Sequence, residues 1–148
     1  MNAPQITLRP GDACDLEFLR RVHREAMRPH VERAFGVWDE AAQRGRFYET
    51  TDPATHEIIE LDGRPVGCQR VRQHPDALQL VRLYLLPEVQ GKGVGTQLVN
   101  RLCERAAESG LVVRLRVFRV NPAQNLYLRL GFKVTGETET HLLMERAA

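Results

Sequence analysis

The chain has 148 residues, of which 43% are hydrophobic and 27% charged, with a formal net charge of +2. This length and balance predict one globular domain, over residues 4–148, and the charge is too small for a nucleic-acid-binding module. No apolar run reaches the ~20 residues that span a bilayer and the first residues lack a signal-peptide core, so we expect no membrane partner and a cytoplasmic location.

The first third of the chain predicts one strand and two helical segments. Residues 6–9 form the strand, and Asp12 or Asp15 can cap a helix that we expect to break or end at Pro29, because proline breaks the helical hydrogen-bond pattern. A second helical region extends from about residue 31 to residue 48.

Gly36 interrupts that second helical region, and Asp39 can cap its second part. Three strands follow, at residues 56–61, 66–74 and 80–86, separated by turns rich in aspartate, glycine and proline.

A long helix comes next, with an apolar residue at every fourth position from Val94 to Ala106 and a stop at Ser109-Gly110. The resulting order of elements, β-α-α-β-β-β-α-β-α-β-β, describes an α/β layered domain with a mixed sheet. The last elements in this order are a strand at 111–118, a short helix at 122–129 and a hairpin at 131–136 and 141–145.

A glycine-rich turn, Gln90-Gly91-Lys92-Gly93-Val94-Gly95, joins the strand at 80–86 to the long helix. The first N–H groups of a helix have no partner within it and lie at the positive end of its dipole, so the turn predicts a phosphate or pyrophosphate site. A Walker A loop does not fit, and Thr96 stands where a Rossmann fingerprint needs its third glycine. The alternative is that these glycines serve the turn alone.

The turn resembles the acyl-coenzyme A pyrophosphate loop of the GCN5-related N-acetyltransferase (GNAT) superfamily, usually written Arg/Gln-x-x-Gly-x-Gly/Ala. Gln90, Gly93 and Gly95 fill this pattern. Residues 121–132 are similar to the second half of the family pattern, Asn-x-x-Ala/Asn followed by Tyr-x-x-x-Gly-Phe, so the resemblance covers essentially the whole chain.

This resemblance implies a mixed, mostly antiparallel central sheet with helices on both faces and one parallel strand pair that splays apart. It also implies acetyl-CoA as cosubstrate, no metal, and acetyl transfer to a primary amine of a small molecule or peptide by direct attack in a ternary complex. The cofactor-binding residues that it implies are Leu85, Leu86, Gln90, Gly91, Lys92, Gly93, Val94, Gly95, Thr96, Asn121 and Asn125.

Two groups are implied for the chemistry itself. The backbone at Leu85 would polarise the acetyl carbonyl, because splaying is expected to leave the N–H groups of Leu85 and Leu86 free. Tyr127 would protonate the thiolate of coenzyme A; with a phenol pKa of ~10 and a thiol pKa of ~8.5, this transfer is uphill by ~2 kcal/mol. The alternative is that Tyr127 only packs, with its hydroxyl in water.

No general base stands out in the sequence. Gln79 occupies a position where some family members carry glutamate, and its amide cannot accept a proton. The remaining candidates, each acting as a base through a water molecule, are Glu60, Glu88, His74 and Tyr84. Near pH 7 a lysine-type amine costs ~4–5 kcal/mol to deprotonate and an α-amine only ~1–1.5 kcal/mol. The absence of a strong base therefore favours an acceptor amine with a low pKa.

Strand alternation suggests a place for the acceptor. Arg82 and Tyr84 are predicted to face away from the long helix, and Arg114 and Arg116 of the neighbouring strand are predicted to share that face. We hypothesise that the three arginines line a pocket for a carboxylate-bearing amine, and Trp38 either walls this pocket or packs in the core. The alternative for the arginines is internal salt bridging to Glu17, Glu25, Glu57 or Glu60.

The three cysteines, Cys14, Cys68 and Cys103, are far apart in the sequence and odd in number, which favours a reducing compartment. We expect Cys103 to be a small buried hydrophobic residue. The histidines show no metal-ligand spacing, so no metal site is predicted.

Two rival functions remain from the sequence. One is a regulatory or inactive GNAT module that binds coenzyme A without turnover. The other is a nucleic-acid-binding module, which the low net charge disfavours. The acceptor amine, the acyl-chain length and the choice between monomer and homodimer stay open. The nucleic-acid rival would use Arg70, Arg72, Arg114, Arg116 and Arg119.

Overall fold

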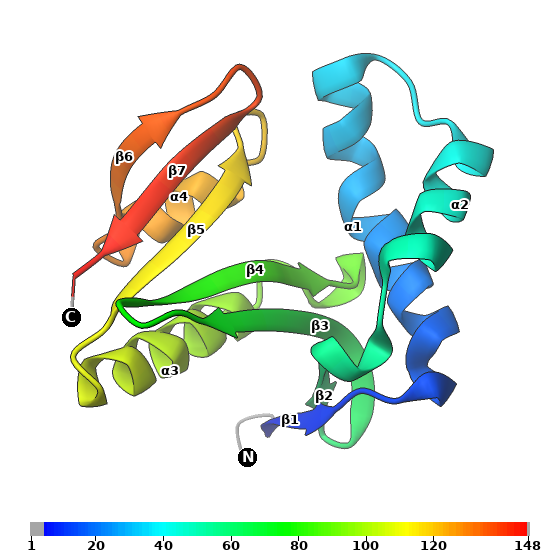
Figure 1. Ribbon diagram of the computed structural model, residues 1–148. Coiled ribbons are helices and arrows are strands. Elements are labelled where there is room, and N and C mark those ends of the chain that lie inside the picture. Colours follow the sequence, from blue (N-terminus) through cyan, green and yellow to red (C-terminus); the bar gives the residue numbers. More distant parts are fainter. Residues whose placement is uncertain (1–4, 148) are drawn as a thin grey trace. The chain divides into compact units, whose positions relative to one another are not determined.

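Seven strands and four α-helices make up residues 5–147, the part of the chain that the computed structural model describes (Figure 1). In chain order they are β1 (Ile6–Pro10), α1 (Leu16–Phe35), α2 (Glu40–Thr50), β2 (Glu57–Leu61), β3 (Arg64–Gln73), β4 (Ala77–Leu85), α3 (Val94–Glu108), β5 (Val112–Phe118), α4 (Ala123–Arg129), β6 (Lys133–Glu137) and β7 (His141–Arg146).

The strands form one sheet in the order β1-β2-β3-β4-β5-β7-β6, in which β4 and β5 are the parallel pair. The predicted element order and the predicted fold class, a mixed and mostly antiparallel sheet, are both confirmed. The predicted domain ends, Pro4 and Ala148, lie outside the described residues. No helix of residues 5–147 is both long and apolar enough to cross a bilayer.

The chain divides into two compact units. Unit 1 contains the chain up to Arg70 and the segment Arg82–Gln90, and unit 2 contains Val71–Val81 and the chain from Gly91. Strands β3 and β4 each contribute residues to both units, so the two units are described separately below.

In unit 1, helices α1 and α2 lie side by side (Figure 1), and β1 and β2 form an antiparallel ladder. Leu19 and Val22 of α1 and Ile58 and Ile59 of β2 are almost completely buried, which makes them the centre of this unit's core. The turn from β2 to β3 has positive φ angles at Asp62 and at the glycine after it, as the aspartate-glycine pair predicts.

Helix α1 continues through Pro29, so the prediction that it breaks or ends there is wrong. Proline cannot donate to the carbonyl of Glu25, but both residues are exposed and water can bond that oxygen. The helix ends at Gly36, whose φ of 86° is the left-handed conformation of a C-cap. Asp39 caps α2 by accepting a hydrogen bond from the N–H of Ala42, as predicted.

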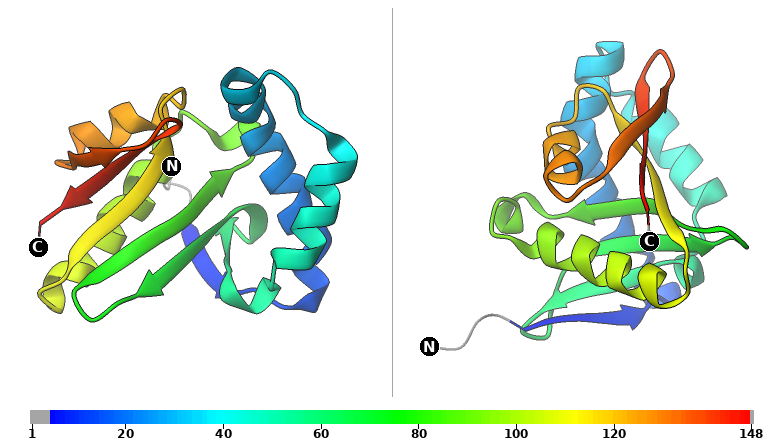
Figure 2. Two further views of the ribbon diagram at one scale, coloured as in Figure 1. Left: turned by 45° about the horizontal axis from the view of Figure 1, so that its top comes forward. Right: turned by 90° about the vertical axis from the view of Figure 1, so that its left-hand side faces the viewer.

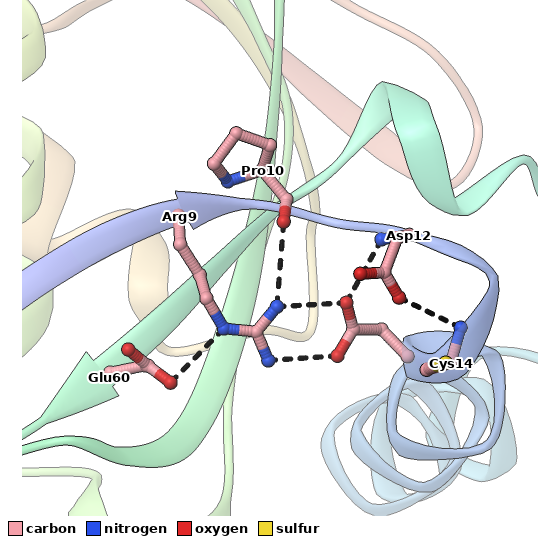
Figure 3. Close-up of polar contacts among 6 residues, drawn as sticks. Arg9, Pro10, Asp12, Cys14 and Glu60 are labelled. Carbon is pink, nitrogen blue, oxygen red and sulfur yellow. Dashed lines mark hydrogen bonds and ion pairs between the residues drawn. The ribbon is translucent and has the colours of Figure 1, made fainter.

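An arginine connects the first strand, the following turn and β2 (Figure 3). The guanidinium of Arg9 donates to both carboxylate oxygens of Asp15, at 2.8 and 2.9 Å, and to Glu60 at 3.1 Å. Asp15 also accepts from the N–H of Asp12, and Asp12 accepts from the N–H of Cys14, which completes a capping box before α1.

In unit 2, α3 extends alongside β5 (Figure 2). The predicted stripe of α3 is confirmed, since Val94, Leu98, Leu102 and Ala106 are all buried. Cys103 is buried on the same helix, as expected of a small hydrophobic residue.

The parallel ladder pairs residues 77–80 of β4 with residues 112–115 of β5, and it corrects one prediction. Gln79 is paired with Arg114, and paired residues of neighbouring strands project to the same face. Arg114 therefore shares the face of Gln79. The predicted alternation placed it with the even-numbered residues, which is wrong for the paired residues 77–80, because a shift of one residue in register exchanges the faces.

Candidate functional site

The glycine-rich turn leads into the N-terminus of α3, where the first three N–H groups form the head of the helix. The N–H of Gln97 makes the first bond of α3, to the carbonyl of Gly93 at 3.1 Å, so the N–H groups of Val94, Gly95 and Thr96 have no partner within the helix. No side chain caps this end. Gly93 has a φ of 82°, which a residue with a Cβ adopts only with strain.

The segment before the helix is fixed to the end of β4 within unit 1. The side-chain Nε2 of Gln90 donates to the carbonyl of Leu85 at 3.0 Å. The family pattern has glutamine or arginine at this position, and both side chains carry an N–H donor that could bond the carbonyl of the last residue of β4.

The predicted pair of free N–H groups at the end of β4 is wrong for Leu86. Its N–H donates to the carbonyl of Val66 in β3 at 2.8 Å, and its side chain is buried. Neighbouring N–H groups along a strand point to opposite edges, so that of Leu85 is expected to point away from Val66. The bond at Leu86 follows from strand pairing, which the sequence alone does not give.

Gly67 of β3 is a positioning residue that sequence reasoning missed. A Cβ at this residue would overlap the carbonyl oxygen of Tyr84 and lie 3.2 Å from the Cα of Leu85. The glycine therefore allows β3 and the end of β4 to approach more closely than other residues would permit. A glycine inside a predicted strand was the available signal.

Helix α4 presents the second half of the motif in unit 2. Tyr127 is buried, with its ring 5.6 Å from that of Phe132 in an edge-to-face arrangement. The Oδ1 of Asn121 accepts from the N–H of Ala123, so this side chain caps α4 and has only its amide N–H groups left for a ligand. Asn125 is exposed.

Three of the four candidate bases are engaged or protonated. Glu60 is paired with Arg9, and Glu88 lies 3.9 Å from Arg21. Burial raises the pKa of Tyr84 to about 12, which keeps its phenol protonated at neutral pH.

The fourth candidate base, His74, faces the glutamine that replaces the glutamate of some family members. Its Nε2 lies 2.8 Å from the Oε1 of Gln79, so this ring nitrogen donates and only Nδ1 can accept a proton. None of the four candidates therefore stands out as a strong base.

A small hollow in unit 1 lies between α1 and α2. Trp38 lines it, and its Nε1 donates to Glu40 at 2.7 Å. The ring of His23 lies between three aromatic side chains, 6.0 Å from Trp38, 5.7 Å from Phe47 and 5.7 Å from Tyr84. The full lining is Arg20, His23, Arg24, Trp38, Glu40, Gln43, Arg44 and Phe47.

The arginines proposed for the acceptor differ in their surroundings. Arg114 lies 3.2 Å from Asp76 and 3.8 Å from Glu145, and Arg116 is exposed. Arg82 is half-buried and forms no ion pair with a carboxylate of the described residues. The alternative of internal salt bridging is confirmed for Arg114, although its partners are Asp76 and Glu145 and not one of the four glutamates named for it.

The sequence matches the family described as "Acetyltransferase (GNAT) family" over residues 19–132. The match includes the open head of α3 and the whole of α4. The chain belongs to this family. The family pattern specifies residues in two places, the turn before α3 and the segment around the tyrosine of α4. Both places agree with the GNAT assignment.

Two of the proteins with a similar sequence are named as acetyltransferases. An uncharacterised N-acetyltransferase of Mycobacterium bovis is 38% identical over 96 residues, which are 62% of this chain and 62% of that protein. The mycothiol acetyltransferase of Thermomonospora curvata is 35% identical over 116 residues, 76% of this chain and 38% of that protein. The chain thus spans less than two thirds of the length of either relative.

A solved structure shows the same fold. The PaiA N-acetyltransferase of Thermoplasma acidophilum, in complex with coenzyme A, superposes with a TM-score of 0.79 at 23% identity, covering 97% of this chain and 99% of that one. At this identity the likeness establishes the GNAT fold. Among residues 5–147 there is no group of three histidine, cysteine or acidic side chains that could hold a metal ion.

Proposed function

We propose that the protein is an acetyl-CoA-dependent N-acetyltransferase that acetylates a primary amine of a small molecule or peptide. The observation that carries this proposal is the head of α3, where three consecutive N–H groups have no helical partner and no side-chain cap. In a chain of the GNAT family, a diphosphate is the ligand that such a group of donors suits best.

The chain's residues fit acetyl-CoA at this position. Gly91 and Gly93 adopt positive φ and are exposed, so a phosphate can approach their backbone, and the ammonium of Lys92 can approach the same anion. Acetyl-CoA supplies the activated thioester. The residues proposed to bind it are Leu85, Leu86, Gln90, Gly91, Lys92, Gly93, Val94, Gly95, Thr96, Asn121 and Asn125.

Leu85 and Tyr127 are proposed to act at the reacting atoms. The N–H of Leu85 would donate to the acetyl carbonyl and so favour the build-up of negative charge on its oxygen. The hydroxyl of Tyr127 would give its proton to the departing sulfur of coenzyme A. None of the four candidate bases stands out as a strong base, which supports an acceptor whose amine loses its proton easily.

Binding and turnover test this proposal separately. Calorimetry with coenzyme A should show binding that Gly93→Ala weakens by at least about tenfold, since a Cβ strains the turn and crowds the phosphate. Gly110→Ala is the matched control, because Gly110 also has positive φ but lies at the other end of α3. Binding unaffected by Gly93→Ala would contradict the assigned phosphate site.

Release of free thiol from acetyl-CoA, measured with a panel of primary amines, decides between an enzyme and the rival module. We expect amine-dependent thiol release. Tight binding of coenzyme A with no release for any amine class would instead support a regulatory or inactive GNAT module.

A further inference from the structure

Arg82 of β4 carries a positive charge that the described part of the protein does not compensate. Its side chain is half-buried, and it forms neither an ion pair nor a hydrogen bond with residues 5–147. Two other half-buried arginines of unit 1 each hold a carboxylate: Arg9 holds Asp15 at 2.8 Å, and Arg20 holds Glu40 at 3.2 Å. Arg82 differs in this respect from Arg9 and Arg20.

The groups that share the electrostatic field of Arg82 are uncharged at neutral pH. Burial, and then the positive charge of Arg82, lowers the pKa of His23 to about 4, so its imidazole is neutral. Burial raises the pKa of Tyr84 and that of the Cys68 thiol to about 12, so both keep their protons. Burial, and then the positive charge of Arg82, also lowers the pKa of His56. None of these four groups supplies a negative charge to the guanidinium.

A partly desolvated cation without a counter-ion is unfavourable, and a bound anion would relieve that cost. The planar guanidinium fork matches the two oxygens of a carboxylate, and a single uncompensated cation matches a single negative charge. Arg82 precedes Leu85 by three residues, about 10 Å along an extended strand, and an arginine side chain together with an α-amino acid can bridge this length.

We propose that Arg82 binds the carboxylate of the acceptor, so that the substrate is an amine that also carries a carboxylate. This inference rests on the proposed acetyltransferase function and deepens it. Of the three arginines predicted to line the acceptor pocket, only Arg82 is kept in this proposal. Arg114 is paired with Asp76 and Glu145, and Arg116 is exposed. The aromatic side chains around His23 would border the apolar part of the same substrate.

A kinetic comparison tests the charge requirement directly. Each α-amino acid is assayed against its own amide, which keeps the α-amine and loses the negative charge, and the rates are compared at equal concentrations of unprotonated amine because the carboxylate raises the pKa of the amine. We expect kcat/KM to be about 10- to 100-fold higher for the acid, the range of a hydrogen bond between charged groups. Arg82→Gln should abolish this preference by lowering the rate for the acid, whereas Arg46→Gln, at an exposed arginine of α2, should preserve it.

Arg82→Lys keeps the positive charge but loses the planar guanidinium, so it should retain part of the preference for the acid. This variant distinguishes a loss of charge from a loss of folding. Equal turnover of acid and amide by the unmodified protein would overturn the proposal. A preference for the acid that persists in Arg82→Gln would overturn it as well.

Nuclear magnetic resonance of the His23 ring gives a readout that needs no turnover. A carboxylate bound at Arg82 offsets the positive field, so a saturating amino acid, added to the protein with coenzyme A, should raise the pKa of His23 from about 4. Arg82→Gln should raise it without ligand and remove the response. The charged or titratable groups facing this ring are Arg20, Arg24, Glu40, Arg44, Arg82 and Tyr84.

Thiol release tests the acetyltransferase function and the titration of His23 tests the carboxylate site, so the two measurements show which proposal fails. If no amine releases thiol, the acetyltransferase function is wrong, and the titration still decides the role of Arg82. If thiol is released but the pKa of His23 does not respond to any amino acid, the enzyme stands and the carboxylate site is wrong.

Discussion

Tyr127 shows how one residue combines packing with proposed chemistry. Its ring is buried against Phe132, which fixes the direction in which the hydroxyl points. This burial is what the alternative, in which Tyr127 only packs, also predicts, but packing alone would need no hydroxyl. A substitution that keeps the ring therefore distinguishes the two roles.

Tyr127→Phe should lower kcat by about a hundredfold, near the lower end of the effect of a general acid, and leave the affinity for coenzyme A and the unfolding temperature nearly unchanged. Steady-state thiol release and calorimetry measure these quantities. Tyr48→Phe is the matched control, since its exposed hydroxyl donates to Glu17 and lies in unit 1. Full activity in Tyr127→Phe would show that the residue only packs.

At the scale of elements, β3 can approach β4 closely because Gly67 has no side chain. Gly67→Ala should lower the free energy of unfolding by about 1–3 kcal/mol, because the new methyl group must displace the backbone at Tyr84 and Leu85. Since Leu85 moves with it, kcat should fall as well. Chemical denaturation and thiol release measure the two effects.

Gly45→Ala is the comparison for that variant. Gly45 lies inside α2 with no atom within 4 Å of an added Cβ, so alanine should stabilise the protein by about 0.5–1 kcal/mol and leave activity unchanged. A Gly67→Ala protein as stable as Gly45→Ala would show that β3 and β4 can separate without cost.

The connection from β1 to β2 through Arg9 predicts how stability depends on pH. The bond from Arg9 holds the pKa of the Asp15 carboxyl below its usual value of 3.8. A carboxyl whose pKa is lower in the folded state stabilises that state fully above the unfolded value, and the contribution disappears as the pH falls through the folded value. Acid should therefore weaken this connection below about pH 4.

Asp15→Asn should cost about 1–3 kcal/mol at pH 7, because Arg9 loses a charged acceptor in a buried position. The difference from the unmodified protein should shrink below about pH 4, where Asp15 itself is protonated. Urea denaturation at a series of pH values measures it, with Glu139→Gln at an exposed residue as the control. A difference that stays constant down to pH 2 would contradict the assigned ion pair.

At the scale of the whole molecule, a ligand that binds only the folded chain must stabilise it. Acetyl-CoA at 100 times its Kd should add about 2.7 kcal/mol to the free energy of unfolding. For a chain of 148 residues this corresponds to a rise in Tm of roughly 5–10 °C. Adenosine, which lacks the diphosphate, should produce almost no shift; an equal shift would place the main contacts away from the head of α3.

The order of the elements could be predicted from the sequence because its signals are local. The four-residue repeat from Val94 to Ala106 specifies one helix, and the pair Asp62-Gly63 specifies one hairpin turn. The same holds for the glycine-rich turn, whose geometry depends on its own backbone. Pro29 misled the prediction because an exposed helix face tolerates the lost hydrogen bond.

The details of the site depend on contacts between distant segments, and these could not be predicted. Which face Arg114 occupies depends on its pairing with Gln79, and the bond at Leu86 depends on its pairing with Val66. That Arg82 lacks a counter-ion is known only when the position of every described carboxylate is known. Sequence spacing carries none of this information.

The hydrogen bond from Gln90 to the carbonyl of Leu85 has a consequence for which acyl groups can approach. A bare carbonyl oxygen at the end of β4 would repel the partially negative oxygen of an incoming thioester. With one of its two lone pairs bonded to an amide donor, this carbonyl would repel such an oxygen less strongly. If acetyl-CoA binds as proposed, the glutamine would thereby ease the approach of the acyl oxygen without touching the acyl group.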